Sequence, residues 1–152
     1  VEEVNRRQRN VFAKKILSRF QNNLRKKVIA VWGLSFKPNT DDMREAPSVS
    51  IIKELLKHHA TVHVTDPVAL HEARKHLGNS VKYFEDNYKT LKGADALVVV
   101  TEWNEFRRPD FDKVKSLMRQ HVIFDGRNIY NPQTLREKGF EYIGVGRGAA
   151  NE

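Results

Sequence analysis

The chain has 152 residues, of which 39% are hydrophobic and 30% are charged, a size and composition typical of one globular domain. It contains no cysteine, which excludes disulfides, thiolate metal ligands and a cysteine nucleophile within these residues, and no apolar run approaches the ~20 residues that span a bilayer. The net charge of +8 suits an anionic small molecule, an acidic partner or nucleic acid, but the basic residues are spread along the chain, so we expect no nucleic-acid partner.

Apolar residues recur at helical spacing between Val4 and Leu24, which predicts a long amphipathic helix over residues 2–24. In so small a domain this helix has no evident partner for its apolar stripe. Two interpretations stay open: the helix packs on the domain's own sheet, or residues 1–26 are the end of an interdomain or dimerisation helix. Because Val1 starts in the middle of the pattern and no methionine precedes it, we expect a fragment of a longer protein.

From Lys27 onward, strand-like and helix-like patterns alternate. The strand-like runs are 28–32, 61–65, 96–101, 122–124 and 140–143, with a weaker run at 81–84, and the helix-like runs are 48–58, 68–77, 88–92, 111–119 and 133–138. Near-continuous apolar strands such as ALVVV are typical of a parallel sheet that helices cover. The sequence predicts a Rossmann-like, doubly wound α/β domain over residues 27–147, with a mainly parallel sheet and helices on both faces. The long N-terminal helix precedes it, and a flexible tail follows at 148–152.

The loop after the first predicted strand carries the most informative side chains. Residues 31–48 read VWGLSFKPNTDDMREAPS, so the apolar strand stops at Gly33 and a polar loop leads to Pro47, which opens a helical pattern. Open α/β sheets bind ligands at such loops, where backbone N–H groups and a helix N-terminus face the ligand. Because Ser35 and Pro38 replace two glycines of the G-x-G-x-x-G fingerprint, Lys37 is the first candidate to bind an anion, by its charge.

Other predicted strand ends place polar side chains at the same edge. Asp66 follows the second strand, either as an acid for ribose hydroxyls or, as we favour, as an Asx turn. Glu102 and Trp103 follow ALVVV, and we expect Trp103 to pack rather than to stack on a ligand. Arg127 follows the strand at 122–124; it either shares a cleft with Lys37, where two cations suit a diphosphate, or pairs with a local carboxylate. The histidines lack zinc-site spacing, so we predict no metal site. No Ser-His-Asp order with a glycine-flanked nucleophile appears either, and we predict no catalytic residue in this chain.

Four ordered motifs resemble a known family. GLSFKPNTDDMREAPS, DP after the second strand, TEW after ALVVV, and FDGRN are together similar to the C-terminal, UDP-binding domain of the UDP-glucose/GDP-mannose dehydrogenase family over residues 28–147. VEEVNRRQ is similar to the end of that family's long central helix. The resemblance, strongest to members that act on UDP-glucose, implies a two-step, NAD-dependent oxidation of UDP-glucose to UDP-glucuronate. It implies that NAD is held mainly by an N-terminal domain and that a cysteine nucleophile lies in the middle region, so we expect this chain to be inactive alone.

The resemblance also implies roles for individual residues. Phe36, Lys37 and Arg127 match the family's substrate-binding positions, and Arg44 matches the residue that reaches the NAD held by the other domain. The acidic residues beside Arg44 are expected to orient these cations and the loop rather than to touch an anionic ligand.

The partners implied are the UDP-sugar, the N-terminal NAD-binding domain of the same protein and a second copy, bound through the N-terminal helix. We expect no membrane partner, and the lack of cysteine and of a signal-peptide pattern favours the cytoplasm. Two alternatives stay open: a dehydrogenase of GDP-mannose or a UDP-N-acetylhexosamine in the same family, or a nucleotide-binding module that performs no catalysis.

Overall fold

The computed structural model describes residues 2–35, 37–44 and 46–145, with side chains described from Asn10 onward. One sheet has the strand order β3-β2-β1-β4-β5-β6, and every neighbouring pair is parallel. The strands are β1 (Val28–Trp32), β2 (Thr61–Thr65), β3 (Lys82–Tyr83), β4 (Ala96–Val99), β5 (Val122–Asp125) and β6 (Glu141–Gly144). The predicted doubly wound α/β fold is therefore confirmed, whereas the predicted tail at 148–152 lies outside the described residues.

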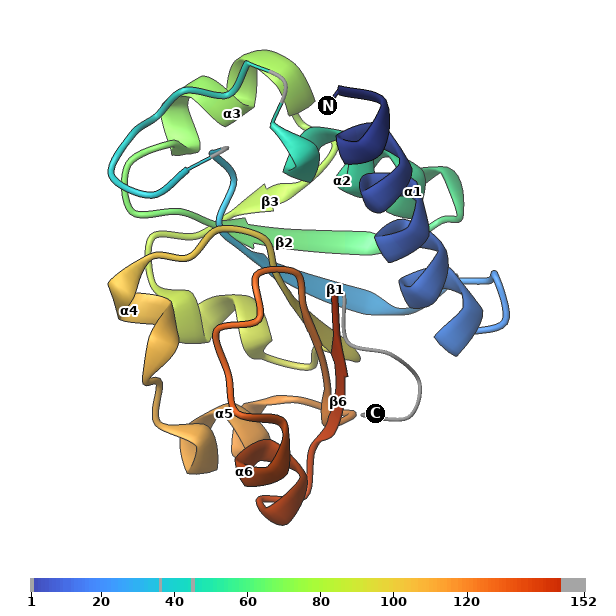
Figure 1. Cartoon of the computed structure of the whole chain (residues 1–152), viewed down its shortest axis with the longest axis vertical. Helices are drawn as coiled ribbons and strands as arrows, with labels where there is room; N and C mark the ends of the chain where they lie inside the picture. Colours follow the sequence, from blue (N-terminus) through green and yellow to red (C-terminus); the bar gives the residue numbers. More distant parts are fainter. Residues whose placement is uncertain (1, 36, 45, 146–152) are drawn as a thin grey trace.

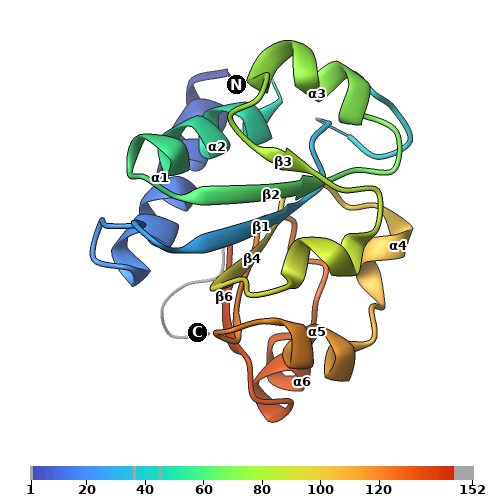
Figure 2. The ribbon, with the colours of Figure 1, turned by 180° about the vertical axis from the view of Figure 1, so that it is seen from behind.

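Helices cover both faces of the sheet (Figure 1 and Figure 2). One face carries α1 (Glu2–Arg19), α2 (Pro47–Lys57) and α3 (Leu70–Leu77); the other carries the 3₁₀ helix η1 (Asn87–Leu91), α4 (Asn104–Arg107), α5 (Phe111–Leu117) and α6 (Pro132–Glu137). Alternate strand residues serve the two layers, since Ile29 and Val31 join the first core and Ala30 and Trp32 the second. In the part of the chain that the structure describes, no helix combines the length and apolar character needed to cross a membrane.

Helix α1 ends earlier than the sequence pattern predicted. It stops at Arg19 rather than at residue 24, because Gln21 and Asn22 adopt left-handed φ angles of 58° and 59° and turn the chain toward β1. Phe20 and Leu24, which completed the helical pattern, lie in this turn and are buried there. Two smaller differences are that the pattern at 88–92 forms a 3₁₀ helix and that the short helix α4 was not predicted.

The described apolar side chains of α1 pack inside this domain. Phe12, Ile16 and Leu17 are buried in the core, and the ring of Phe12 meets that of Phe124 edge-on with centroids 6.4 Å apart. For these side chains, the first of the two interpretations is correct: the helix packs on the domain's own sheet. They do not need a partner molecule to cover them, whereas Val11, which is 49% exposed, faces outward.

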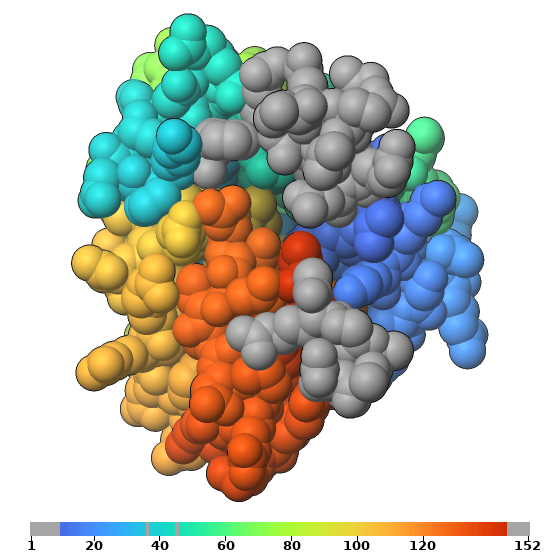
Figure 3. Space-filling view, viewed as in Figure 1, coloured from blue at the N-terminus to red at the C-terminus, as the bar shows by residue number. Residues whose placement is uncertain are grey.

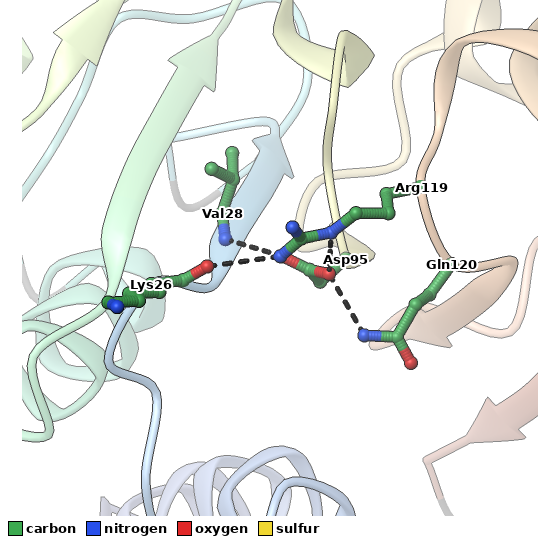
Figure 4. A network of polar contacts seen from close by, with 5 residues as sticks. All are labelled: Lys26, Val28, Asp95, Arg119 and Gln120. Atoms are coloured by element: carbon green, nitrogen blue, oxygen red, sulfur yellow. Dashed lines mark hydrogen bonds and ion pairs between the residues drawn. The ribbon is translucent and has the colours of Figure 1, made fainter.

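The amino end of the sheet is closed by a buried carboxylate that sequence reasoning missed (Figure 4). Asp95 accepts hydrogen bonds from the Val28 N–H at 2.9 Å, from Gln120 at 2.9 Å and from Arg119 through both oxygens at 2.9 Å, while Arg119 also donates to the Lys26 carbonyl at 3.0 Å. Burial alone would raise the pKa of Asp95, but these hydrogen bonds outweigh it and hold the pKa below its ordinary value. Asp95 therefore ties β1 and β4 to the segment that precedes β5.

The carboxyl ends of the strands lie in register along the opposite edge. Trp32 is opposite Thr65 and Val99, and Val99 is opposite Asp125. The strand order reverses between β1 and β4, so the loops that follow these two strands diverge. Open α/β sheets bind their ligands at such a reversal, so a ligand is expected between these two loops.

Candidate functional site

A cleft of about 440 Å³ opens between the loop after β1 and the segment after β4. Its lining includes Pro38 and Asn39 from the loop after β1, and Glu102, Trp103 and Arg107 from the segment after β4. In Figure 3 the surface of the first loop (cyan) lies against that of the segment around residues 100–110 (gold). The cleft thus lies where the strand order reverses, and its volume is in the range of small-molecule sites, about 300–1,000 Å³.

The loop that carries Lys37 is anchored at its base. Gly33 has a φ of 96°, and a Cβ atom at this position would lie 2.5 Å from the Cβ of Thr101, so only glycine allows the two loops to approach. The Thr101 hydroxyl donates to the carbonyl of Ser35 at 2.7 Å, and the Ser35 hydroxyl donates to the carbonyl of Lys37 at 2.7 Å. The backbone of Lys37 is therefore fixed relative to the end of β4.

The side chain of Asp66 holds the start of this loop by hydrogen bonds to its backbone. One oxygen of its buried carboxylate accepts the N–H groups of Leu34 at 2.7 Å and Ser35 at 3.4 Å, and the other accepts those of Val68 at 3.0 Å and Ala69 at 2.9 Å. Because backbone donors occupy both oxygens, the Asx-turn interpretation is confirmed, and the carboxylate has no room for ribose hydroxyls.

Arg127 is placed by the turn that follows β5. The buried carboxylate of Asp125 accepts the N–H of Arg127 at 3.0 Å, the N–H of Tyr130 at 2.9 Å and the hydroxyl of Tyr142 at 2.8 Å. A Cβ atom on Gly126 would lie 2.8 Å from a backbone oxygen of β4, so the turn sits tightly on the neighbouring strand. These contacts fix the point at which the Arg127 side chain leaves the sheet.

Glu102 links two arginines at the cleft. Nη2 of Arg127 lies 2.5 Å from Oε1 of Glu102, and Nη2 of Arg107 lies 3.8 Å from Oε2. Of the two interpretations of Arg127, pairing with a carboxylate is therefore what the structure shows, and the partner comes from the loop of the neighbouring strand. The sequence did not identify Glu102 as the partner, and it gave no role to Arg107. The register could have identified the partner, because Val99 lies opposite Asp125, three residues before Glu102 and two before Arg127.

The sequence-predicted site residues fall into two groups. Lys37 is exposed and precedes Pro38, which lines the cleft, and Arg127 contacts Glu102, which lines the same cleft. Lys37 is therefore adjacent in sequence to the cleft, and Arg127 is joined to it through Glu102. Phe36 lies outside the described residues.

Arg44 lies farther along the loop after β1 and is 88% exposed. Its guanidinium binds both carboxylate oxygens of Asp42, at 3.1 Å from Nε and 3.0 Å from Nη2. The hydrogen bond from the Arg44 side chain, helped by one from its backbone, lowers the pKa of Asp42 to about 2. Asp42 therefore orients Arg44, as expected for an acidic residue of this loop.

Two aromatic residues of the TEWNEF segment pack below the cleft. Trp103 is 8% exposed and Phe106 is fully buried, with its ring stacked on that of Trp32 at a centroid distance of 5.3 Å. The prediction that Trp103 packs is confirmed. Its indole N–H has no hydrogen-bond partner within the described structure, a cost that an acceptor from a ligand would remove.

The arrangement is suited to binding an anion. Arg107 lines the cleft, Lys37 directly precedes the lining residue Pro38, and Arg127 pairs with the lining residue Glu102. Charge-assisted hydrogen bonds from such cations favour phosphate. Among the described residues, no group of three or more acidic or histidine side chains could hold a metal ion.

Comparison with known proteins shows to which family this chain belongs. The description "UDP-glucose/GDP-mannose dehydrogenase family, UDP binding domain" belongs to a family model that matches residues 30–132, from β1 to the first residue of α6. The chain belongs to this dehydrogenase family. The family resemblance of the four motifs is thereby confirmed, and the matched residues include both loops of the cleft and the turn of Arg127.

Individual relatives agree with the family assignment. UDP-glucose 6-dehydrogenase of Pseudomonas aeruginosa is 41% identical, over 97% of this chain and 34% of its own length. A UDP-glucose dehydrogenase from the archaeon Pyrobaculum islandicum has a TM-score of 0.78 and 35% identity, covering 96% of this chain and 31% of that one. NDP-N-acetyl-D-galactosaminuronic acid dehydrogenase from Methanosarcina mazei has a TM-score of 0.77 and 27% identity, with 94% and 29% covered. The chain spans about a third of the length of these relatives.

Proposed function

We propose that this chain is the substrate-binding domain of an NAD-dependent UDP-glucose 6-dehydrogenase, which oxidises UDP-glucose to UDP-glucuronate in two steps. The observation that carries the proposal is the cleft at the reversal of strand order in a member of this family, with Lys37 next to its lining residue Pro38 and Arg127 paired with its lining residue Glu102. A UDP-sugar diphosphate at this edge would meet both charges. Phe36, next to Lys37, is the third proposed substrate contact.

NAD is the proposed cofactor and serves as the hydride acceptor when bound. The loop after β1 does not fit the pyrophosphate cradle of a dinucleotide site, because Ser35 and Pro38 stand where that motif has glycines. Arg44 fits a smaller role. Its exposed guanidinium, oriented by Asp42, would donate hydrogen bonds to NAD held mainly by an N-terminal domain. This chain's own part in the reaction is to bind and orient the nucleotide sugar.

The proposal is tested by turnover of the full-length protein. We expect it to reduce two NAD per UDP-glucose, because oxidation of an alcohol to a carboxylate removes four electrons, and we expect the 152-residue chain alone to be inactive. The same assay with GDP-mannose and UDP-N-acetylhexosamines tests the second candidate, which the likeness to the Methanosarcina mazei enzyme favours. Binding of UDP without any NAD reduction would contradict the proposed enzyme activity and favour the alternative of a non-catalytic nucleotide-binding module.

We also propose that two copies associate through the N-terminal helix. The outward-facing Val11 supports this, since it is one of the exposed large apolar side chains. Sedimentation of the full-length protein should give a dimer, and a monomer at micromolar concentration would contradict it. Cell fractionation tests the proposed cytoplasmic location.

A further inference from the structure

We propose that Glu102 occupies the anion position of Arg127 until a nucleotide diphosphate binds, and that Arg107 then holds Glu102 aside. The inference rests on the proposed function, since its ligand is the diphosphate of a UDP-sugar. It assigns Glu102 and Arg107 as positioning residues that act through Arg127.

The two oxygens of Glu102 face different arginines. Oε1 lies 2.5 Å from Arg127, a tight charge-assisted hydrogen bond, whereas Oε2 lies 3.8 Å from Arg107, an ion pair that a small side-chain rotation would shorten. All three side chains are between 33% and 43% exposed, so a ligand from solvent can reach the group and the side chains can rearrange. The backbone of Arg127 is fixed by Asp125, so the guanidinium can change its anion without moving the turn.

A phosphate at Arg127 would meet a repulsive neighbour. The Glu102 carboxylate already binds the guanidinium that the phosphate needs, and two anions within a few ångströms of each other repel unless a cation intervenes. Arg107 is the cation in place to intervene, and it lines the same cleft. If Glu102 turns toward Arg107, one ion pair is exchanged for another and every charge stays paired before and after binding.

This exchange predicts the direction in which each charge affects affinity. Glu102 competes with the diphosphate, so removing its charge should tighten binding. Arg107 neutralises Glu102 during binding, so its loss should weaken binding, but only while Glu102 is charged. A direct contact between Arg107 and the phosphate would instead weaken binding whether or not Glu102 is charged.

The test is a double-mutant cycle in which UDP binding to the full-length protein is measured by calorimetry. We expect Glu102→Gln to tighten UDP binding by about two- to fivefold, the range of partly exposed ion pairs, and Arg107→Ala to weaken it by a similar factor. In the double variant the Arg107→Ala penalty should vanish. Uridine, which lacks phosphate, should bind equally to all four proteins, and unchanged melting temperatures verify that each variant is folded.

Matched controls separate contact from overall charge. Glu105 lines the same cleft, is exposed and has no ion pair within the described structure, so Glu105→Gln should change UDP affinity by less than Glu102→Gln does. Arg108→Ala is the corresponding control for Arg107. The inference is overturned if Glu102→Gln weakens UDP binding, if Glu105→Gln matches its effect, or if the Arg107→Ala penalty persists in the double variant. UDP binding without the expected pattern overturns this inference alone, whereas a wild-type protein that does not bind UDP overturns the proposed function as well.

Discussion

Replacing the Asp125 carboxylate by the isosteric amide should destabilise the protein. Oδ1 accepts the N–H of Arg127, and Oδ2 accepts both the N–H of Tyr130 and the hydroxyl of Tyr142. Asparagine has one acceptor oxygen and one NH₂ group, so either orientation of Asp125→Asn directs an NH₂ group at a backbone N–H. Because the site is buried, water cannot satisfy the stranded donor.

The magnitude follows from the hydrogen bonds that the amide cannot make. One buried donor without a partner, together with the loss of a charged acceptor, should cost about 2 kcal/mol or more. In a domain of this size, 2 kcal/mol corresponds to a fall in melting temperature of about 4–8 °C. Tyr142→Phe removes one hydroxyl donor and leaves both backbone bonds, so its cost should be smaller, about 1 kcal/mol.

Urea unfolding followed by circular dichroism measures these differences. Asp41→Asn is the matched control, because Asp41 is exposed and its replacement should change stability by less than about 0.5 kcal/mol. If Asp125→Asn is as stable as the Asp41→Asn control, the reasoning about the turn that places Arg127 is refuted.

Three further predictions concern the loop after β1 and the amino end of the sheet. Gly33→Ala should cost about 2–4 kcal/mol in urea unfolding, from left-handed strain and overlap with Thr101, and a loss below ~0.5 kcal/mol would contradict the close approach of the loops. Asp95→Ala should cost about 1.5–3 kcal/mol at pH 7. Because the pKa of Asp95 is lowered in the folded protein, its contribution to stability is complete above the ordinary pKa of 3.8 and is lost as the pH falls through the folded value. The loss of stability caused by Asp95→Ala should therefore be smaller in acid than at pH 7. An equal loss at pH 2 and pH 7 would count against the network. Lys37→Ala in the full-length protein should weaken UDP binding by more than ~1 kcal/mol in calorimetry, and unchanged affinity would remove Lys37 from the site.

Local patterns were sufficient to predict the sheet and the position of the cleft. The apolar runs at 28–32 and 96–101, alternating with helical patterns, are typical of a covered parallel sheet, and the strand ends then placed Lys37 and Arg127 at one edge. Asp66 was interpreted correctly because Asp-Pro after a strand is a local turn signal that needs no tertiary information.

The features that sequence reasoning missed depend on contacts between distant segments. The Arg127–Glu102 pair joins residues that follow different strands, and the choice of carboxylate is made by register and rotamer. Burial of Asp95 is possible only because Arg119 and Gln120 return to it from the segment before β5. The end of α1 was misplaced because the residues that turn the chain, Gln21 and Asn22, are not glycine.

The most direct test of the central claim is a crystal structure of the full-length protein with UDP bound. We expect diphosphate oxygens within hydrogen-bond distance of Nζ of Lys37 and of the Arg127 guanidinium, at the edge where the strand order reverses. A diphosphate bound away from both side chains would contradict the claim.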